Sequence, residues 1–353
     1  MDANVLIPAV TAVLATAMAV ALVDQWRSRR RGYQMAWALG MAFFAVAVGV
    51  EAVAAAGGWS EPLYRAWYLS GAVWTAGWLG LGTAFLLGRT RFGFGFALCL
   101  FLAGLFTFLT ARRNPEIYAD AGTVAMLYFL AAAVLALAVS VETYFQNWRW
   151  PWMALLAVGG ATLLSLLIMA TTTLPAPGYS LDPATGVPNA AILPPELRLL
   201  TPFMNVSGAF ALILGALFSA YVFMPKRRVL AYSLDPGQSG DQFLFNLFIA
   251  PIAITVNFVA SLPGAIRALR RGDINSRVPA TLLIALGAFI PALTDSLNRF
   301  GSTEWYQSGK LLSALLLLAG FLVSTETFSE IRVPFTSVVL RGARREAREA
   351  AEH

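Results

Sequence analysis

The chain has 353 residues, of which 58% are hydrophobic and only 12% are charged. A soluble domain keeps about a quarter of its residues charged, and here the charges collect between long apolar runs. The composition therefore predicts an all-α polytopic membrane protein. The net charge of +6 fits basic cytoplasmic loops that meet anionic lipid head groups, and no nucleic-acid-binding module accompanies it.

Cysteine and histidine usage excludes several chemistries. Cys99 is the only cysteine, and the only histidine, His353, is the last residue. A disulfide or thiolate cluster within the chain needs more than one cysteine, and zinc hydrolases, Ser–His proteases and bis-histidine haem sites need imidazole inside the fold. We therefore predict no cofactor, no metal and no catalytic residue. An enzyme working through carboxylates alone is the least favoured class.

Nine apolar runs have the length of about 20 residues that crosses a bilayer. They cover residues 5–23, 35–56, 63–87, 94–111, 121–143, 151–171, 203–224, 279–298 and 306–326. Only Asp2 and Asn4 are polar before the first run, which lacks the basic segment of a secretory signal. We therefore expect this run to be retained as the first helix.

A tenth run, 243–264, is less regular, because Asn246, Pro251 and Asn257 interrupt it. If this run does not cross the membrane, the cytoplasmic segments hold 19 of the 25 Lys and Arg residues, and if it crosses they hold 12. The positive-inside rule favours the first arrangement. We predict nine full spans, with ten possible, and a segment near 243–264 that is broken, re-entrant or at the cytoplasmic face. The alternative is a tenth span kinked at Pro251.

The same rule places the N-terminus outside and the C-terminus in the cytoplasm, and the membrane is expected to be the plasma (inner) membrane of a bacterium. Four regions follow in chain order. They are a six-helix membrane bundle at 1–171, an extracytoplasmic loop rich in Pro and Thr at 172–202, C-terminal membrane helices at 203–328 and a basic cytoplasmic tail at 329–353. The loop is either a lid over a cavity or a linker between two bundles.

Three charged residues fall in the outer halves of predicted spans, namely Glu51, Asp295 and Lys310, and a fourth, Arg299, directly follows one of these spans. A charge in hydrocarbon costs roughly 2.5–3.5 kcal/mol and normally faces a partner or water. These residues are therefore candidates for a ligand-binding site. The alternative is a set of structural ion pairs, with Lys310 extending toward the membrane surface.

The third span has an aromatic side and a small-residue side. At 100° per residue, Tyr64, Trp67, Trp74 and Trp78 fall on one side, and small residues including Gly77 fall on the other. The small side predicts close helix packing. The aromatic side either faces lipid and packed neighbours or lines a groove for an apolar or ring-bearing ligand.

A weak internal repeat relates two predicted hairpins. Shifting the chain by 243 residues places 58–85 over 301–328, with Glu61, Ser70 and Gly77 among the identical positions. Such repeats and interrupted helices are typical of transporters. The first hypothesis is therefore a transporter or channel-like protein for a small or amphiphilic substrate. The alternative is a receptor-like or scaffold subunit of a membrane complex without an output domain of its own.

The expected partners follow from these two hypotheses. They are membrane lipid, a small-molecule substrate and a membrane protein partner, and nucleic acid is not expected. A water-accessible cavity between the two hairpins would favour transport, whereas a solid core would argue against it.

Overall fold

The structure is a computed structural model that describes the chain except for residues 1–2, 184–185, 236, 238, 300–304 and 325–353. Ten described helices are long and apolar enough to cross a membrane. They are α1 (Ala3–Arg29), α2 (Gly32–Gly57), α3–η1–α4 (Glu61–Leu86), α5 (Phe92–Arg113), α7 (Gly122–Tyr144), α8 (Trp150–Thr171), α9 (Pro195–Phe223), α10 (Gly240–Arg271), α11 (Arg277–Arg299) and α12 (Tyr306–Val323). The short α6 (Pro115–Tyr118) and η2 (Ala119–Ala121) join α5 to α7. The predicted all-α multi-span membrane fold is confirmed.

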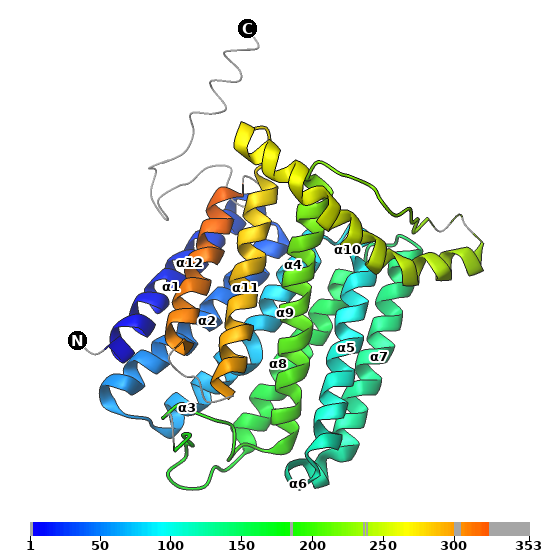
Figure 1. The fold of residues 1–353 in the computed structure, drawn as a ribbon. Coiled ribbons are helices and arrows are strands. Elements are labelled where there is room, and N and C mark those ends of the chain that lie inside the picture. The colour runs from blue at the N-terminus through cyan, green and yellow to red at the C-terminus, as the bar shows by residue number, and fades with distance from the viewer. Residues whose placement is uncertain (1–2, 184–185, 236, 238, 300–304, 325–353) are drawn as a thin grey trace.

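All of these long helices except α10 run roughly side by side, and α10 crosses one end of the bundle (Figure 1). The basic connections at 27–31, 89–91 and 226–228 lie toward the end that α10 crosses. Residue 3 begins α1 at the opposite end, where the connection between α8 and α9 also lies. The arrangement therefore separates a basic end from an end that carries the longest described connection.

The helix α9 begins earlier than the predicted span, at Pro195 instead of residue 203. Proline suits the first helical position, and the acidic Glu196 in the first turn complements the helix dipole. The connection before α9 is therefore shortened to 172–194. It packs onto the outer end of α3, where the hydroxyl of Tyr64 donates a hydrogen bond to the carbonyl of Asn189.

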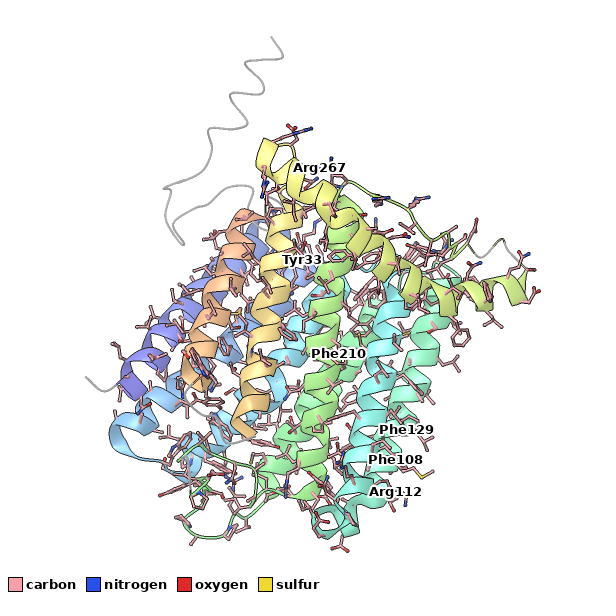
Figure 2. All side chains as sticks on the ribbon, viewed as in Figure 1. Tyr33, Phe108, Arg112, Phe129, Phe210 and Arg267 are labelled. Atoms are coloured by element: carbon pink, nitrogen blue, oxygen red, sulfur yellow. The ribbon has the colours of Figure 1, made fainter. Side chains whose placement is uncertain are left out.

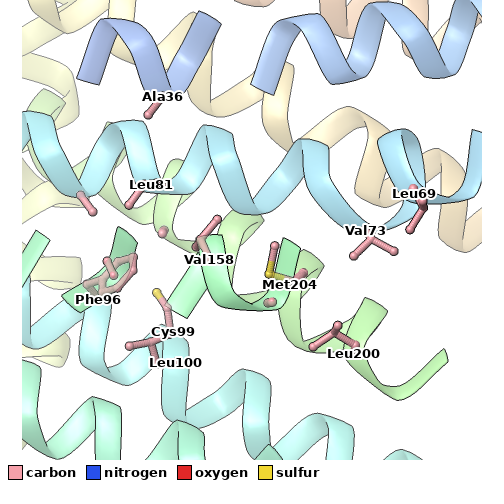
Figure 3. Close-up of a cluster of buried hydrophobic side chains, with 14 of the residues drawn as sticks. Ala36, Leu69, Val73, Leu81, Phe96, Cys99, Leu100, Val158, Leu200 and Met204 are labelled. Atoms are coloured by element: carbon pink, nitrogen blue, oxygen red, sulfur yellow. The ribbon is translucent and has the colours of Figure 1, made fainter. Parts of the chain in front are cut away.

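The centre of the bundle is the crossing of α4 and α9, and glycines allow it. A Cβ atom on Gly80 would lie 2.6 Å from the Cα of Gly208, and one on Gly77 would lie 2.6 Å from the Cε of Met204. Apolar side chains from the neighbouring helices fill the surrounding space (Figure 3). The void at this crossing has a volume of only about 10 Å³. The predicted close packing through small residues is confirmed.

The helix α10 is continuous through Pro251 and Pro263, so the break predicted near 243–264 does not occur. Each proline removes one main-chain hydrogen bond, but membrane-associated helices tolerate this when side chains compensate. The hydroxyl of Thr255 donates to the carbonyl of Pro251 at 2.8 Å, an additional bond within the helix just after the proline. The helix lies across one end of the bundle instead of running beside the other long helices (Figure 1).

The inner face of α10 rests on the ends of four other helices. The ring of Phe243 packs against Phe94 of α5 and Tyr144 of α7, with centroids 5.8 and 4.9 Å apart. Further along, Ala265 belongs to a buried cluster with Tyr221 of α9 and Val278 of α11.

The polar residues of α10 bind the main chain of the segment that precedes it. The Oδ1 of Asn257 accepts hydrogen bonds from the amides of Val229 and Leu230, at 2.7 and 2.9 Å, and its Nδ2 donates to the Leu230 carbonyl. The Oδ1 of Asn246 accepts from the Ser233 amide at 3.3 Å. Asn246 and Asn257, predicted to interrupt the helix, instead hold this segment along it.

We expect the substitution Gly208→Ala to lower the thermal unfolding midpoint in detergent, with a loss of about 1–3 kcal/mol, because the new methyl group would overlap main-chain atoms of α4. Gly160→Ala on α8 is the matched control, since a Cβ there meets no atom within 4 Å. Equal midpoints for the two variants would contradict the described crossing.

Candidate functional site

Glu51 on α2 and Lys310 on α12 form an ion pair inside the bundle. The Nζ of Lys310 lies 2.6 Å from Oε1 and 2.8 Å from Oε2 of Glu51. The Glu51 side chain is only 5% exposed, and the Lys310 side chain is 13% exposed. Glu51 lies about 9 Å of helix rise before the end of α2, and Lys310 lies about 6 Å after the start of α12. Both helix ends are at the end of the bundle opposite α10. The pair therefore joins two helices from opposite ends of the sequence at a depth where a lone charge is costly.

Two neutral side chains complete the hydrogen bonding of the Glu51 carboxylate. The indole Nε1 of Trp67 donates to Oε1 at 2.8 Å, and the amide Nε2 of Gln307 donates to Oε2 at 3.0 Å. The ammonium group of Lys310 also lies 3.7 Å from the centroid of the Tyr306 ring, where the π-electrons stabilise a cation. A buried ion pair is stable only when additional hydrogen bonds satisfy its atoms, and this one has them.

The structure brings together two of the four charged residues predicted for this site. Asp295 and Arg299 belong to the last turns of α11, but their side chains lie outside the described residues. Among the residues that the structure does describe, no cluster of three or more His, Cys, Asp or Glu side chains is placed to hold a metal ion. The described part of the site is a Lys–Glu ion pair whose carboxylate accepts two further hydrogen bonds.

Gln307 is a site residue that the sequence interpretation missed. It lies one turn before Lys310 on the same face of α12, so the spacing could have identified it. Its Nε2 binds Glu51, whereas its Oε1 is buried and has no hydrogen-bond partner among the described residues. The site therefore contains one acceptor that is not engaged.

A π-helical segment separates the aromatic residues of the third span. The segment η1 (Tyr68–Trp74) lies between α3 and α4, and its hydrogen bonds run from residue i to i+5, so a turn holds more residues than an α-turn. The angle of 100° per residue therefore does not apply across it. Trp67, before η1, donates to Glu51 of α2. Trp74, the last residue of η1, and Trp78, after it, donate to hydroxyls of α8 and also pack on Phe43 of α2, with ring centroids 4.9 and 6.2 Å apart.

The predicted aromatic residues are engaged by their neighbours. The indole groups of Trp74 and Trp78 donate to the hydroxyls of Ser165 and Thr162, at 2.8 and 3.1 Å. Tyr64 is fully buried beneath the 172–194 connection. These contacts explain why the rings occur at several depths, and an aromatic groove for a ligand stays a prediction.

A second cavity is an open groove of about 650 Å³ between α7 and α8. Leucine, alanine, valine and methionine side chains line it, from Leu127 on α7 to Ala157 on α8. Neither this groove nor the small void beside Gly80 is lined by Glu51 or Lys310. The ion pair is therefore packed in protein and separate from both cavities.

The fold and the site together define a class, that of multi-span α-helical membrane proteins with a buried ion pair between helices. No family model, curated protein or solved structure matches this chain. The function is therefore inferred from the residues and their geometry.

The substitutions Glu51→Gln and Lys310→Met are each expected to destabilise the protein by about 3–5 kcal/mol, because each leaves the opposite charge buried without a partner. The double variant should recover much of this loss. Glu61→Gln is the control, since Glu61 is 42% exposed in its pair with Arg65 and should contribute at most about 1 kcal/mol. Unfolding midpoints in detergent measure these effects, and strictly additive losses would argue against a coupled pair.

Ser165→Ala should destabilise the protein by about 0.5–2 kcal/mol, because the half-buried indole of Trp74 loses its acceptor. Ser140→Ala on α7 is the matched control, since the Ser140 hydroxyl bonds only the carbonyl of Ala136 in its own helix. The same unfolding assay compares the two, and a larger effect at Ser140 would contradict the assigned contact.

Proposed function

We propose that the protein is a transporter or channel-like protein for a small or amphiphilic substrate, and that the Glu51–Lys310 pair closes its outer side in the described conformation. The observation that carries the proposal is this satisfied ion pair within the bundle. Apolar residues of similar volume stabilise a protein as well as such a pair or better. Ionisable residues inside a membrane are therefore candidates for functional groups whose charges separate or change partners.

The position of the pair supports this proposal. It connects the hairpin of α2 and α3 with α12, and these elements contain the two segments related by the weak repeat. With the shift of 243 residues, Trp67 corresponds to Lys310, and both donate to the same oxygen of Glu51. Equivalent elements that meet at a site within the membrane are typical of transporters.

The π-helical segment gives independent support. It begins at Tyr68, directly after the residue that binds Glu51. Segments of this kind inside α-helices occur frequently at functional sites. A change between π- and α-helical winding would rotate Trp67 relative to Trp74, which offers a local route to separating the ion pair.

The solid crossing of α4 and α9 favours a second candidate, a receptor-like or scaffold subunit. Transport needs a water-accessible path, and the two cavities described above do not reach Glu51. In this candidate, the ion pair only joins helices, and the α7–α8 groove contacts a membrane protein partner. In the transport proposal, the same packing belongs to a closed state.

We further propose a bacterial inner membrane with the N-terminus outside and the end bearing α10 in the cytoplasm. The distribution of Lys and Arg supports this orientation, since 14 of the 25 lie in the described segments 27–31, 89–91, 149, 226–228 and 267–277.

Ion flux into proteoliposomes tests the transport proposal, with pH- and sodium-sensitive dyes inside the vesicles and organic cations and amphiphiles as further probes. We expect wild-type protein to carry at least one of these, and Glu51→Gln and Lys310→Met to reduce that flux at least tenfold. Glu61→Gln should keep wild-type flux. Equal flux in the Glu51 and Glu61 variants, with folding verified by their unfolding midpoints, would overturn the proposed role of the pair.

A labelling experiment distinguishes the two candidates. The only cysteine, Cys99, is fully buried, so a Gln307→Cys variant presents one new thiol for membrane-impermeant maleimides. Transport predicts that the labelling rate changes when a carried ion is added on one side. A low, constant rate together with a stoichiometric co-purified membrane protein would favour the scaffold.

A further inference from the structure

The helix α10 has an exposed apolar face opposite the face that packs on the bundle. Large side chains recur on it every three or four residues, which places them on one side of a helix. They include Phe245, Phe248, Ile252, Val256, Val259 and Ile266. Phe248 is 77% exposed. A face of this size and composition needs an apolar environment.

The height of α10 on the bundle places this face at the membrane boundary. Its inner face contacts Phe94 near the start of α5, Tyr144 at the end of α7 and Met224 just after α9. The ends of spanning helices lie where hydrocarbon meets head groups. In Figure 1, α10 runs obliquely across these ends, which is the position of an interfacial amphipathic helix.

Six exposed cations lie along the second half of α10. Arg267, Arg270 and Arg271 lie in its last turns. The preceding segment adds Lys226, Arg227 and Arg228 nearer the middle of the helix, because the Arg227 amide donates to the hydroxyl of Ser261 at 2.8 Å. Ser261 precedes Arg267 by about 9 Å of helix rise. None of the six is in an ion pair within the part of the chain that the structure describes. Figure 2 shows Arg267 at this end and Arg112 at the opposite end of the bundle.

We propose that α10 and residues 226–228 form a docking surface for anionic phospholipids of the cytoplasmic leaflet. The acyl chains cover the exposed apolar face, and the head-group phosphates bind the six cations. Charge complementarity selects this occupant, because an apolar protein surface would cover the face and leave the cations without counter-charges. The inference is independent of whether the protein transports a substrate or acts as a scaffold.

Lipid binding at this surface is coupled to the stability of the bundle. Asn257 is fully buried and fixes the preceding segment to α10, and Ala265 packs with residues of α9 and α11. A ligand that binds only the folded arrangement raises its stability. Anionic lipid should therefore raise the unfolding midpoint of the whole protein.

The first test titrates the full chain in detergent with dioctanoyl phosphatidylglycerol and measures the unfolding midpoint. We expect the anionic lipid to raise it and dioctanoyl phosphatidylcholine to leave it unchanged. A basic residue near a membrane surface changes the affinity for anionic lipid about fivefold. The triple variant Arg267→Gln/Arg270→Gln/Arg271→Gln should therefore need about a hundredfold more phosphatidylglycerol for the same rise in unfolding midpoint. The control Arg112→Gln/Arg113→Gln, at the opposite end, should stay within about fourfold of the wild type.

Three results of this titration would overturn the proposal. They are no response to phosphatidylglycerol, an equal loss in the control variant, and the same response to glycerol phosphate without acyl chains. The last result would assign the cations to a soluble anion.

The second test measures where the apolar face lies. Phe248→Cys and Gln242→Cys are labelled separately with an environment-sensitive fluorophore in nanodiscs that contain phosphatidylglycerol, since the buried Cys99 does not react. We expect blue-shifted emission at position 248, quenched by spin-labelled lipid, and water-like emission at position 242. Water-like emission at 248, or emission that shifts only when a second protein or a higher protein concentration is present, would overturn lipid docking.

Discussion

Hydrocarbon offers no hydrogen-bond partners, and this constraint governs every polar group in the bundle. The Glu51 carboxylate receives bonds from Trp67, Gln307 and Lys310, contributed by two other helices. The indoles of Trp74 and Trp78 reach hydroxyls of α8 in the same way. Polar side chains thus connect α2, α3, α4, α8 and α12, while glycines bring α4 and α9 into contact. The site is one part of this internal network of polar contacts.

The spans themselves could be predicted from the sequence, because their length and apolarity respond directly to the thickness of the membrane. The pairing of Glu51 with Lys310 could be predicted only as part of a group of four. The position of a residue along its span gives its depth in the membrane, but it does not identify which helices are neighbours. The π-helical segment could not be predicted. It widens the helical turn between Trp67 and Trp74, yet the rings of Trp67, Trp74 and Trp78 all contact α2.

For α10, the sequence contained more information than the prediction used. Asn246, Asn257 and Ser261 fall within about 60° of one another at 100° per residue. That spacing indicates one polar stripe on an intact helix, whereas polarity and prolines alone suggested an interruption. The stripe binds the main chain of 227–233. Periodicity therefore outweighs the presence of proline when both prolines lie on the exposed side of a helix.

The buried ion pair supports the transport proposal, whereas the solid crossing of α4 and α9 supports the scaffold proposal. Gln307 bears on both, because its Nε2 donates to the Glu51 carboxylate. Separating Glu51 from Lys310 in hydrocarbon would cost roughly 2.5–3.5 kcal/mol for each charge unless a ligand or water replaced the lost partner. A cation that displaced Lys310 would meet the Glu51 carboxylate and the unengaged Oε1 of Gln307, two oxygen ligands of the kind that hard cations prefer. In the transport proposal, charge exchange occurs at Glu51, whereas in the scaffold proposal the Nε2 of Gln307 only completes the hydrogen bonding of the carboxylate.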